Sequence, residues 1–226
     1  MDPSTAGAAA DFPHPPAEAL AAIETLIRLD RDFAAILDRT GPLPWRRRTP
    51  GFPGLLQAIV AQMISNQAAA AIWGRLRVIP GALDPASLMD LPDDVLRGAG
   101  LSRPKIVHAR ALAAAFLDGT LSADRIALLD DEAAIVAIGS IKGMGRWSAE
   151  IYLLFALDRM DVFPSGDIAL AAALSDLKAL PTRPGPKALR DLATAWRPVR
   201  SLAARLLWHH WRHVTGRLAI DDFVVP

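Results

Sequence analysis

The sequence contains no cysteine, and this excludes several kinds of protein at once. Without thiols the chain cannot form a disulfide scaffold, a zinc finger, an iron–sulfur cluster held by thiolates, or a cysteine nucleophile. Net charge is also small, because 25 lysines and arginines face 24 aspartates and glutamates. With 52% hydrophobic residues, so little net charge excludes disorder as the main state. We therefore expect the 226 residues to bury a full core, as one domain or as two small lobes.

Runs of apolar residues suited to a membrane are missing as well. Residues 49–74 carry no charge, but they include two prolines, three glutamines and an asparagine. Amide side chains are costly in lipid, so this stretch predicts a buried helical segment and no membrane contact. The N-terminus, Met-Asp-Pro, has no basic residues ahead of an apolar run, which argues against a secretory signal. The cytoplasm is the expected location.

Strand-like alternation is scarce, and helical patterns follow one another along the chain. An Ala- and Pro-rich leader, residues 1–16, is expected to be mobile, and residues 17–226 to form one helical domain. The patterns predict an all-α protein of about ten short helices. The helices are expected near residues 17–28, 32–38, 103–117, 130–138, 147–157, 168–177, 187–196 and 199–214, with one or two over 52–77 and further starts at 84–85 and 90–93.

The small net charge hides an uneven distribution. Residues 1–39 hold seven acids and three bases, whereas residues 183–217 hold eight bases and one acid. Such a basic segment indicates a polyanionic partner, although an ordinary solvated helix face has the same composition. The histidines of this segment (His209, His210 and His213) are expected to be solvated or to face phosphate rather than to bind a metal.

The most informative segment, residues 131–170, predicts a helix, a tight turn, a second helix, a loop and a third helix. Two glycines, Gly143 and Gly145, permit a sharp turn and a close approach of the backbone to a partner. The helix after Gly145 would present free N–H groups and its positive dipole end, which suit a nucleic-acid phosphate. The residues expected to contact such a phosphate are Lys142, Gly143, Met144, Gly145 and Arg146.

Asp167 follows the polar loop of this segment and precedes an apolar helix. An aspartate in that position is typical of a helix N-cap, which contributes about 1 kcal/mol. The turn and the helices before it indicate a role beyond capping as the alternative. The residues alone leave both interpretations open.

Together the turn and Asp167 resemble the helix-hairpin-helix and Gly/Pro-Asp superfamily of base-excision DNA glycosylases. Gly-Met-Gly-Arg-Trp-Ser-Ala at residues 143–149 is similar to its alkylation branch, the DNA-3-methyladenine glycosylase II type. The match spans about residues 45–215 and implies two helical lobes around a DNA-binding cleft, with the hairpin at about 131–157. The resemblance also implies that the N-terminal β domain of larger members is absent. Further matching segments are residues 52–67, 98–105 and 196–201 with Trp208.

The resemblance implies that Asp167 is the catalytic residue. Breaking an N-glycosidic bond builds positive charge on the sugar, which a fixed carboxylate stabilises while it orients or deprotonates a water molecule. Bifunctional relatives such as endonuclease III carry a lysine at the position of Trp147, and that amine forms a Schiff base. The resemblance therefore implies a monofunctional enzyme that removes alkylated purines, such as 3-methyladenine and 7-methylguanine, and leaves an abasic site.

The family's pocket for the flipped base falls on Trp147, Trp208, Ile151 and Gln62 in this sequence. Tryptophan suits an electron-poor alkylated base, because cation–π attraction contributes about 0.5–2 kcal/mol. The family has a tyrosine where this chain has Ile151, which puts the base preference in doubt. The two tryptophans have core packing as their alternative role.

Other positions of the resemblance imply contacts to the DNA itself. Met63 aligns with the residue that wedges into the gap left by the flipped nucleotide, and a core methionine is the alternative. Lys105 and Arg103 are expected at the DNA backbone or as a solvated helix start. For Arg200 a phosphate contact and a structural contact near Asp167 both stay open.

No cofactor is expected to be required. Hairpins of relatives often bind a monovalent cation, and the resemblance places such a Na⁺ or K⁺ ion on the main-chain carbonyls of Gly139, Ile141 and Met144. The expected partner is double-stranded DNA with damaged bases, bound by a monomeric, nucleoid-associated protein. Two alternatives stay open: a glycosylase for another lesion class, and a non-catalytic helix-hairpin-helix module that uses Asp167 only as a cap.

Overall fold

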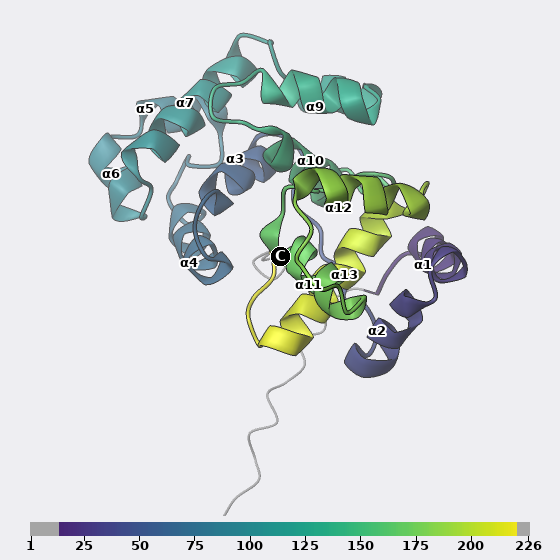
Figure 1. Ribbon diagram of the computed structural model, residues 1–226. Helices are drawn as coiled ribbons and strands as arrows, with labels where there is room; N and C mark the ends of the chain where they lie inside the picture. The colour runs from purple at the N-terminus through teal and green to yellow at the C-terminus, as the bar shows by residue number, and fades with distance from the viewer. Residues whose placement is uncertain (1–13, 221–226) are drawn as a thin grey trace, which may run out of the picture.

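Helices account for all the regular secondary structure in a computed structural model of the protein, which describes residues 14–220 (Figure 1). Within these residues there is no β-strand, so the predicted all-α class is confirmed. The helices are α1 (Ala17–Leu29), α2 (Asp32–Thr40), α3 (Phe52–Ala61), α4 (Asn66–Leu76), α5 (Pro85–Asp90), α6 (Asp93–Gly98), α7 (Arg103–Leu117), α8 (Ala123–Leu128), α9 (Asp131–Gly139), α10 (Arg146–Ala156), α11 (Ile168–Leu177), α12 (Pro186–Ala193), the 3₁₀ helix η1 (Thr194–Trp196) and α13 (Arg200–Thr215).

Most predicted helices lie within one or two residues of those observed. Helix α8 was not predicted; it has six residues, and Ser122 caps it by accepting the N–H of Arg125. Residues 52–77 form two helices, α3 and α4, separated by the short loop 62–65. The leader predicted to be mobile falls mainly on residues 1–13, which lie outside the described residues.

The uncharged segment forms the most deeply buried helix of the protein's first half. Nine of the ten residues of α3 are buried, and the helix packs on α4, α7 and α10. The prediction of buried helical structure is confirmed for α3 but not for α4, where only Ala69, Trp73 and Leu76 of eleven residues are buried. Among the described residues no helix is both long and apolar enough to cross a membrane.

Two groups of helices make up the fold (Figure 1). In the first group α3 contacts α4, α7 and α10, while α5 and α6 pack on α7 and α9 packs on α10. In the second group α13 lies against α1, α2, α11 and η1, so the first and last helices of the chain are side by side. This arrangement confirms the two expected lobes, and α10 with the loop that follows it connects them.

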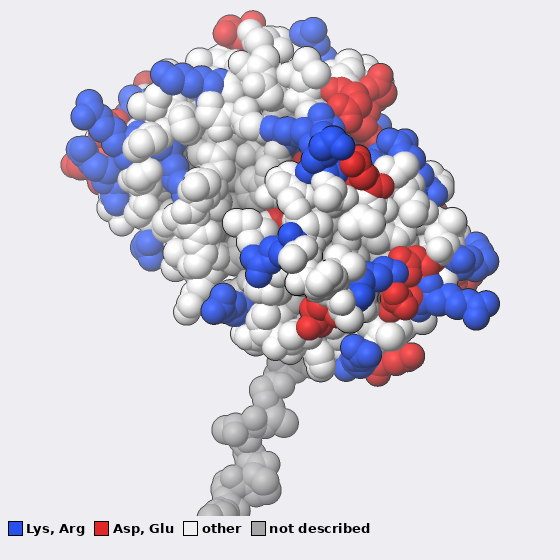
Figure 2. Space-filling model, viewed as in Figure 1, with Lys and Arg blue, Asp and Glu red and all other residues white. Residues whose placement is uncertain are grey.

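The C-terminal basic segment is partly internal: five of its eight basic residues are exposed, Arg200 and Arg212 are half-buried, and Arg205 is buried. Arg205 is only 2% exposed, and Arg197 and Arg200 both pair with Asp161. In Figure 2 basic and acidic side chains are interspersed over the visible lower part of the molecule rather than forming one positive surface. The reason is that α13 is the central helix of its group, so its basic residues are partly internal.

Two histidines of α13 also differ from the prediction. His209 and His210 are buried, not solvated, and the Nε2 of His210 lies 2.7 Å from Asp176 of α11. The acid that the local sequence lacks is supplied by a neighbouring helix. His213 is exposed, as expected.

Candidate active site

The hairpin joins α9 to α10 through residues 140–145. Gly143 has a φ of +86°, and a Cβ added there would lie 2.1 Å from Cγ of the His108 ring on α7. Only glycine fits both the backbone conformation and this close approach. Gly145 is the N-cap of α10 and provides no side-chain acceptor, so the first N–H groups of that helix are left without a cap. The predicted anion-binding helix start is therefore present, with an exposed Lys142 beside it.

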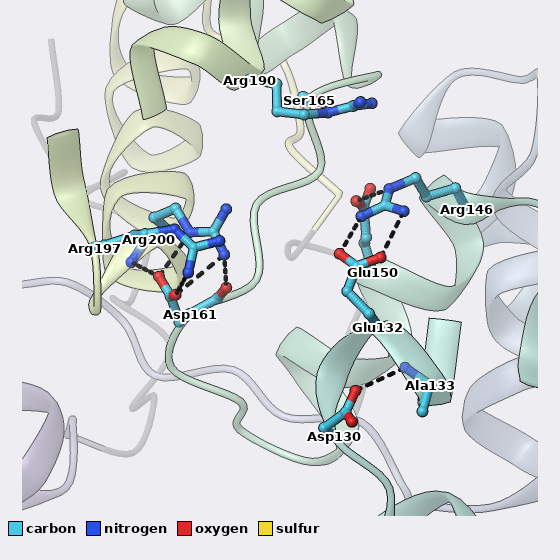
Figure 3. Close-up of polar contacts among 10 residues, drawn as sticks. All are labelled: Asp130, Glu132, Ala133, Arg146, Glu150, Asp161, Ser165, Arg190, Arg197 and Arg200. Atoms are coloured by element: carbon cyan, nitrogen blue, oxygen red, sulfur yellow. Dashed lines mark hydrogen bonds and ion pairs between the residues drawn. The ribbon is translucent and has the colours of Figure 1, made fainter. Parts of the chain in front are cut away.

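Arg146 pairs with two carboxylates of the protein. Its guanidinium donates two hydrogen bonds to Glu132 of α9, at 3.0 and 2.6 Å, and a third to Glu150 at 2.9 Å (Figure 3). A cation held by two carboxylates is largely neutralised. Arg146 thus braces α9 against α10, but its side chain is still 43% exposed, so its contact with DNA stays a prediction.

Asp167 is both a helix cap and the acceptor of two indole hydrogen bonds. Its Oδ1 accepts the main-chain N–H groups of Ala169 and Leu170 at 2.9 and 3.1 Å, and the Nε1–H of Trp208 at 3.3 Å. Its Oδ2 accepts the Nε1–H of Trp147 at 3.1 Å. Burial raises the pKa of Asp167, and these hydrogen bonds act in the opposite direction. Four donors fix the carboxylate in one orientation.

The two tryptophans of the expected base pocket have different exposure. Trp147 is half-buried, whereas Trp208 has no exposed surface and packs on Phe155 with ring centroids 5.4 Å apart. A base therefore cannot stack on Trp208, which instead holds Asp167. Ile151 is likewise completely buried in the core of α10. Of the predicted pocket tryptophans only Trp147 keeps a surface that a ligand can reach.

Gln62 points to the hairpin rather than into a base pocket. Its amide nitrogen donates to the carbonyl oxygen of Gly143 at 2.8 Å and to Oγ of Ser148 at 2.9 Å. Both amide hydrogens are thereby used within the protein. The assignment of Gln62 to the base pocket is corrected to a contact between the end of α3 and the start of α10.

Met63 is almost completely exposed, at 98%, with a φ of +57° in the loop between α3 and α4. The alternative of a core methionine is therefore wrong. An exposed, flexible apolar side chain at the end of a buried helix is the geometry that a wedge residue needs.

The remaining basic residues of the predicted DNA surface separate into three cases. Lys105 is 9% exposed and its Nζ donates to the Val60 carbonyl at 2.6 Å, so it is a structural residue whose pKa burial lowers. Arg200 is bound to Asp161 at 2.7 Å, which decides for a structural contact, though not one with Asp167 (Figure 3). Arg103 is exposed at the start of α7, which fits both of its expected roles, a DNA contact and a solvated helix start.

The carbonyls proposed for a monovalent cation lie along the hairpin turn. The Ile141 carbonyl accepts the Met144 N–H at 2.9 Å, whereas those of Gly139 and Met144 accept no backbone hydrogen bond from the part of the chain that is described. Unpaired main-chain carbonyls are suitable hard-oxygen ligands, so the turn fits such an ion. Within residues 14–220 no group of three or more His, Asp or Glu side chains could hold a metal.

A polar pocket of about 410 Å³ was not anticipated from the sequence. It lies between α9, α10 and α12 and is lined by Glu132, Arg146, Glu150, Asp161 and Arg190, among others (Figure 3). Burial raises the pKa of Glu150 to about 7. The i, i+4 spacing of Arg146 and Glu150 was the signal in the sequence that could have indicated this pair. Asp167 does not line the pocket.

The sequence matches the family model described as HhH-GPD superfamily base excision DNA repair protein over residues 56–198. It is 30% identical over 176 residues to DNA-3-methyladenine glycosylase 1 of Schizosaccharomyces pombe, covering 76% of this chain and 74% of the relative. The alkylbase DNA glycosidase-like protein mag2 of the same yeast is 26% identical, over 81% of this chain and 89% of its own.

Solved structures give the same likeness in three dimensions. The S. pombe 3-methyladenine DNA glycosylase in complex with abasic DNA superposes with a TM-score of 0.77 at 26% identity, covering 85% of this chain and 95% of that one. A DNA-3-methyladenine glycosidase from Bacillus halodurans has a TM-score of 0.71 at 29% identity, covering 86% and 90% of the two chains.

Proposed function

The chain belongs to the HhH-GPD superfamily of base excision DNA repair proteins, and on this premise we propose that it is a DNA glycosylase that removes alkylated purines from duplex DNA. The observation that carries the proposal is the Asp167 carboxylate, held by two main-chain N–H groups and by the indoles of Trp147 and Trp208. A non-catalytic DNA-binding module has no use for two tryptophan donors aimed at a buried carboxylate. The names of the similar yeast proteins support alkylated purines as the substrate class.

Different residues carry out the different steps of the proposed reaction. The uncapped start of α10 and Lys142 bind a backbone phosphate, while Met63 enters the stack in place of the extruded nucleotide. A flipped base then lies against the accessible side of Trp147. A Na⁺ or K⁺ ion on the hairpin carbonyls would add positive charge beside the bound phosphate. None of these contacts reads the base sequence, so recognition rests on the damaged base itself.

Asp167 supplies the chemistry of the proposed reaction. As the N-glycosidic bond breaks, the ionised carboxylate stabilises the positive charge on the sugar, and it orients a water molecule that attacks the anomeric carbon. Because its donors come from α10, α11 and α13, the carboxylate does not need to reorient during the reaction. Such preorganised stabilisation contributes roughly 10²–10³ in rate.

We further propose that the enzyme is monofunctional. The groups that donate to Asp167 are main-chain N–H groups and indoles, and within residues 14–220 no lysine amine is among them. Lys105 is held by the Val60 carbonyl, and Lys142 lies on the exposed turn. Without an amine beside the sugar no Schiff base can form, so water is the nucleophile and the product is an abasic site.

A single-turnover assay on methylated duplex DNA tests both parts of the proposal. We expect release of 3-methyladenine and 7-methylguanine, with strand breaks only after alkali. Asp167→Asn should abolish release while leaving affinity for an abasic-analogue duplex unchanged or tighter, because a negative charge near the phosphate path is removed. Breaks without alkali would show a lyase. Excision by the Asn variant would refute the assigned role of Asp167, and no release by the wild type would shift the assignment to another lesion class or to a binding module.

A further inference from the structure

Gln62 connects two parts of the protein that act on DNA from different sides. It is the last residue before Met63 in the loop 62–65, which we call the wedge loop, and it terminates α3. Its amide nitrogen donates both hydrogens to the hairpin segment, one to the Gly143 carbonyl at 2.8 Å and one to the Ser148 hydroxyl at 2.9 Å. Ser148 is 2% exposed and lies in the first turn of α10, next to Trp147.

The backbone of the wedge loop has a conformation that needs support. Met63 has a φ of +57°, which costs a residue other than glycine roughly 1–2 kcal/mol. Its side chain is 98% exposed, so packing of Met63 itself contributes almost nothing. The loop is held on either side instead: Gln62 is bound to the hairpin, and Ser65 caps α4 by accepting the Ala68 N–H at 3.2 Å.

Helix α7 contacts both the end of α3 and one partner of Gln62, Gly143. Lys105 donates to the Val60 carbonyl near the end of α3, and the His108 ring lies against the α-carbon of Gly143. The end of α3 and the turn of the hairpin are therefore both anchored on the same helix. Gln62 spans the remaining distance between them, and its two hydrogen bonds set how Met63 is placed relative to the phosphate-binding turn.

The geometry points to Gln62 as a positioning residue that couples insertion of Met63 to phosphate binding by the hairpin. This inference rests on the proposed function. With the two hydrogen bonds in place, the wedge loop and the hairpin bind the duplex as one rigid unit. Because Ser148 is next to Trp147 in α10, the same hydrogen bonds also position Trp147. Without them, Met63 can relax from its left-handed backbone, and extrusion of the base loses the support of a prepositioned wedge.

We expect the loss of activity in a Gln62 variant to depend on how much free energy is needed to extrude the base. Flipping a paired base costs a few kcal/mol, and a mismatched base costs less. Gln62→Leu keeps the length of the side chain and removes both donors. We expect single-turnover excision from a fully paired methylated duplex to fall by about 10- to 100-fold. Excision from the same methylated strand annealed with mismatches opposite the methylated bases should fall by less than about 3-fold, because the wedge is needed least there.

Three further variants separate positioning from a general structural effect. Ser148→Ala removes one of the two acceptors and should give a smaller, equally selective loss, whereas Ser148→Thr keeps the hydroxyl and should restore paired-duplex activity. Gln67→Leu is the matched control, because Gln67 is exposed on α4 and its side chain makes no hydrogen bond within the described residues. It should leave both activities unchanged. Far-ultraviolet circular dichroism and thermal melting of every variant verify folding.

A second readout does not require excision. A duplex with a tetrahydrofuran abasic analogue and a neighbouring 2-aminopurine reports unstacking by the wedge as a rise in fluorescence. The wild type and Gln67→Leu should give the rise, and Gln62→Leu should give less than half of it at saturating protein. An equal loss of excision on paired and mismatched DNA, or an unchanged fluorescence signal in Gln62→Leu, would overturn the inference. If the wild type excises nothing, the proposed function fails, and the fluorescence alone decides whether Gln62 couples the wedge to the hairpin.

Discussion

Two tryptophans, together with two main-chain N–H groups, stabilise the ionised form of the residue on which the proposed chemistry depends. Burial raises the pKa of Asp167, and the indole N–H groups of Trp147 and Trp208 counteract this by binding the charged form. The active form is the ionised one, so activity is lost as pH falls through this pKa. The acid limb of the rate profile should therefore lie above the usual range for an aspartate.

Replacing Trp208 with phenylalanine tests how far an indole hydrogen bond offsets the effect of burial on the pKa of Asp167. Trp208→Phe removes a hydrogen bond to a charged acceptor and fills most of the same buried space, so the pKa of Asp167 rises further. We expect the acid limb of kcat to move to higher pH by about one unit, equivalent to about 1.4 kcal/mol. Trp196→Phe is the matched control, because its indole donates to Asp30 at 2.9 Å instead of Asp167. A limb that stays in place in Trp208→Phe, or moves equally in Trp196→Phe, contradicts the assignment.

The raised pKa of Glu150 leads to a second prediction at the scale of a single residue. Burial raises its pKa from 4.5 to about 7, although Arg146 opposes the shift. A carboxyl whose folded pKa is raised contributes stability at low pH that is lost as pH rises between these two values. Glu150→Gln lacks this titration, so its unfolding free energy relative to wild type should increase by about 3 kcal/mol from pH 4 to pH 8.

The control for Glu150 is its neighbour in the same ion-pair network. Hydrogen bonding to Arg146 lowers the pKa of Glu132, so its contribution to stability is lost as pH falls below 4.5. Glu132→Gln should therefore leave the pH dependence between 5 and 8 as it is in the wild type. Urea unfolding across this pH range measures both variants. A Glu150→Gln profile parallel to that of the wild type would mean that Glu150 is ionised throughout.

At the scale of elements, the hairpin depends on one of its two glycines more than on the other. Gly143 has a positive φ and touches the His108 ring, whereas nothing lies within 4 Å of a Cβ placed on Gly145, whose φ is −107°. The sequence presents the two glycines as equivalent parts of a turn. The packing of α7 on the hairpin makes them different.

Alanine substitutions measure that difference. Gly143→Ala should destabilise the protein by about 2 kcal/mol or more, from backbone strain and displacement of His108, and should weaken binding to an abasic-analogue duplex. Gly145→Ala should change stability by less than about 1 kcal/mol. Thermal unfolding and fluorescence-anisotropy titrations provide the two measurements. Equal effects of the two substitutions would show that the close approach of His108 is unimportant.

At the scale of the whole molecule, Arg205 joins the two groups of helices. From α13 it donates to the carbonyls of Arg46 and Leu154 at 2.9 Å each, and it lies 4.0 Å from the ring centroid of Trp45. It also pairs with Asp158 at 3.3 Å. A guanidinium with this many partners replaces hydration by internal contacts and fixes α13 against α10.

Removing this buried cation should lower the stability of the folded protein. Arg205→Leu should lower the unfolding free energy by about 3 kcal/mol, because the carbonyls and Asp158 lose their donor, and lower Tm by about 6–12 °C. Arg47 pairs with the same aspartate but is 64% exposed, so Arg47→Leu should cost less than about 1 kcal/mol. Differential scanning calorimetry distinguishes the two. Similar losses for both variants would show that the aspartate, rather than the buried position, is what matters.

The amino-acid sequence determined what depends on short-range physics. The helix Arg103–Leu117 was predicted with its observed ends, because apolar spacing and Pro104 in the first turn act locally. The turn at Gly143 and the cap at Asp167 were found for the same reason. These local features, with the family resemblance, were sufficient to predict the all-α fold, the hairpin and the proposed catalytic carboxylate.

Only the tertiary structure decided which partner each polar side chain has. Gln62, Lys105 and Arg200 were expected at the base or the DNA, and they bind the hairpin, Val60 and Asp161 instead. Trp208 was expected to stack on a base and is buried beneath Asp167. A long side chain makes its contacts with whatever the fold brings within about 3 Å, and those neighbours lie 39 to 81 residues away along the chain. Charge and residue type are local properties, whereas pairing and exposure belong to the folded molecule.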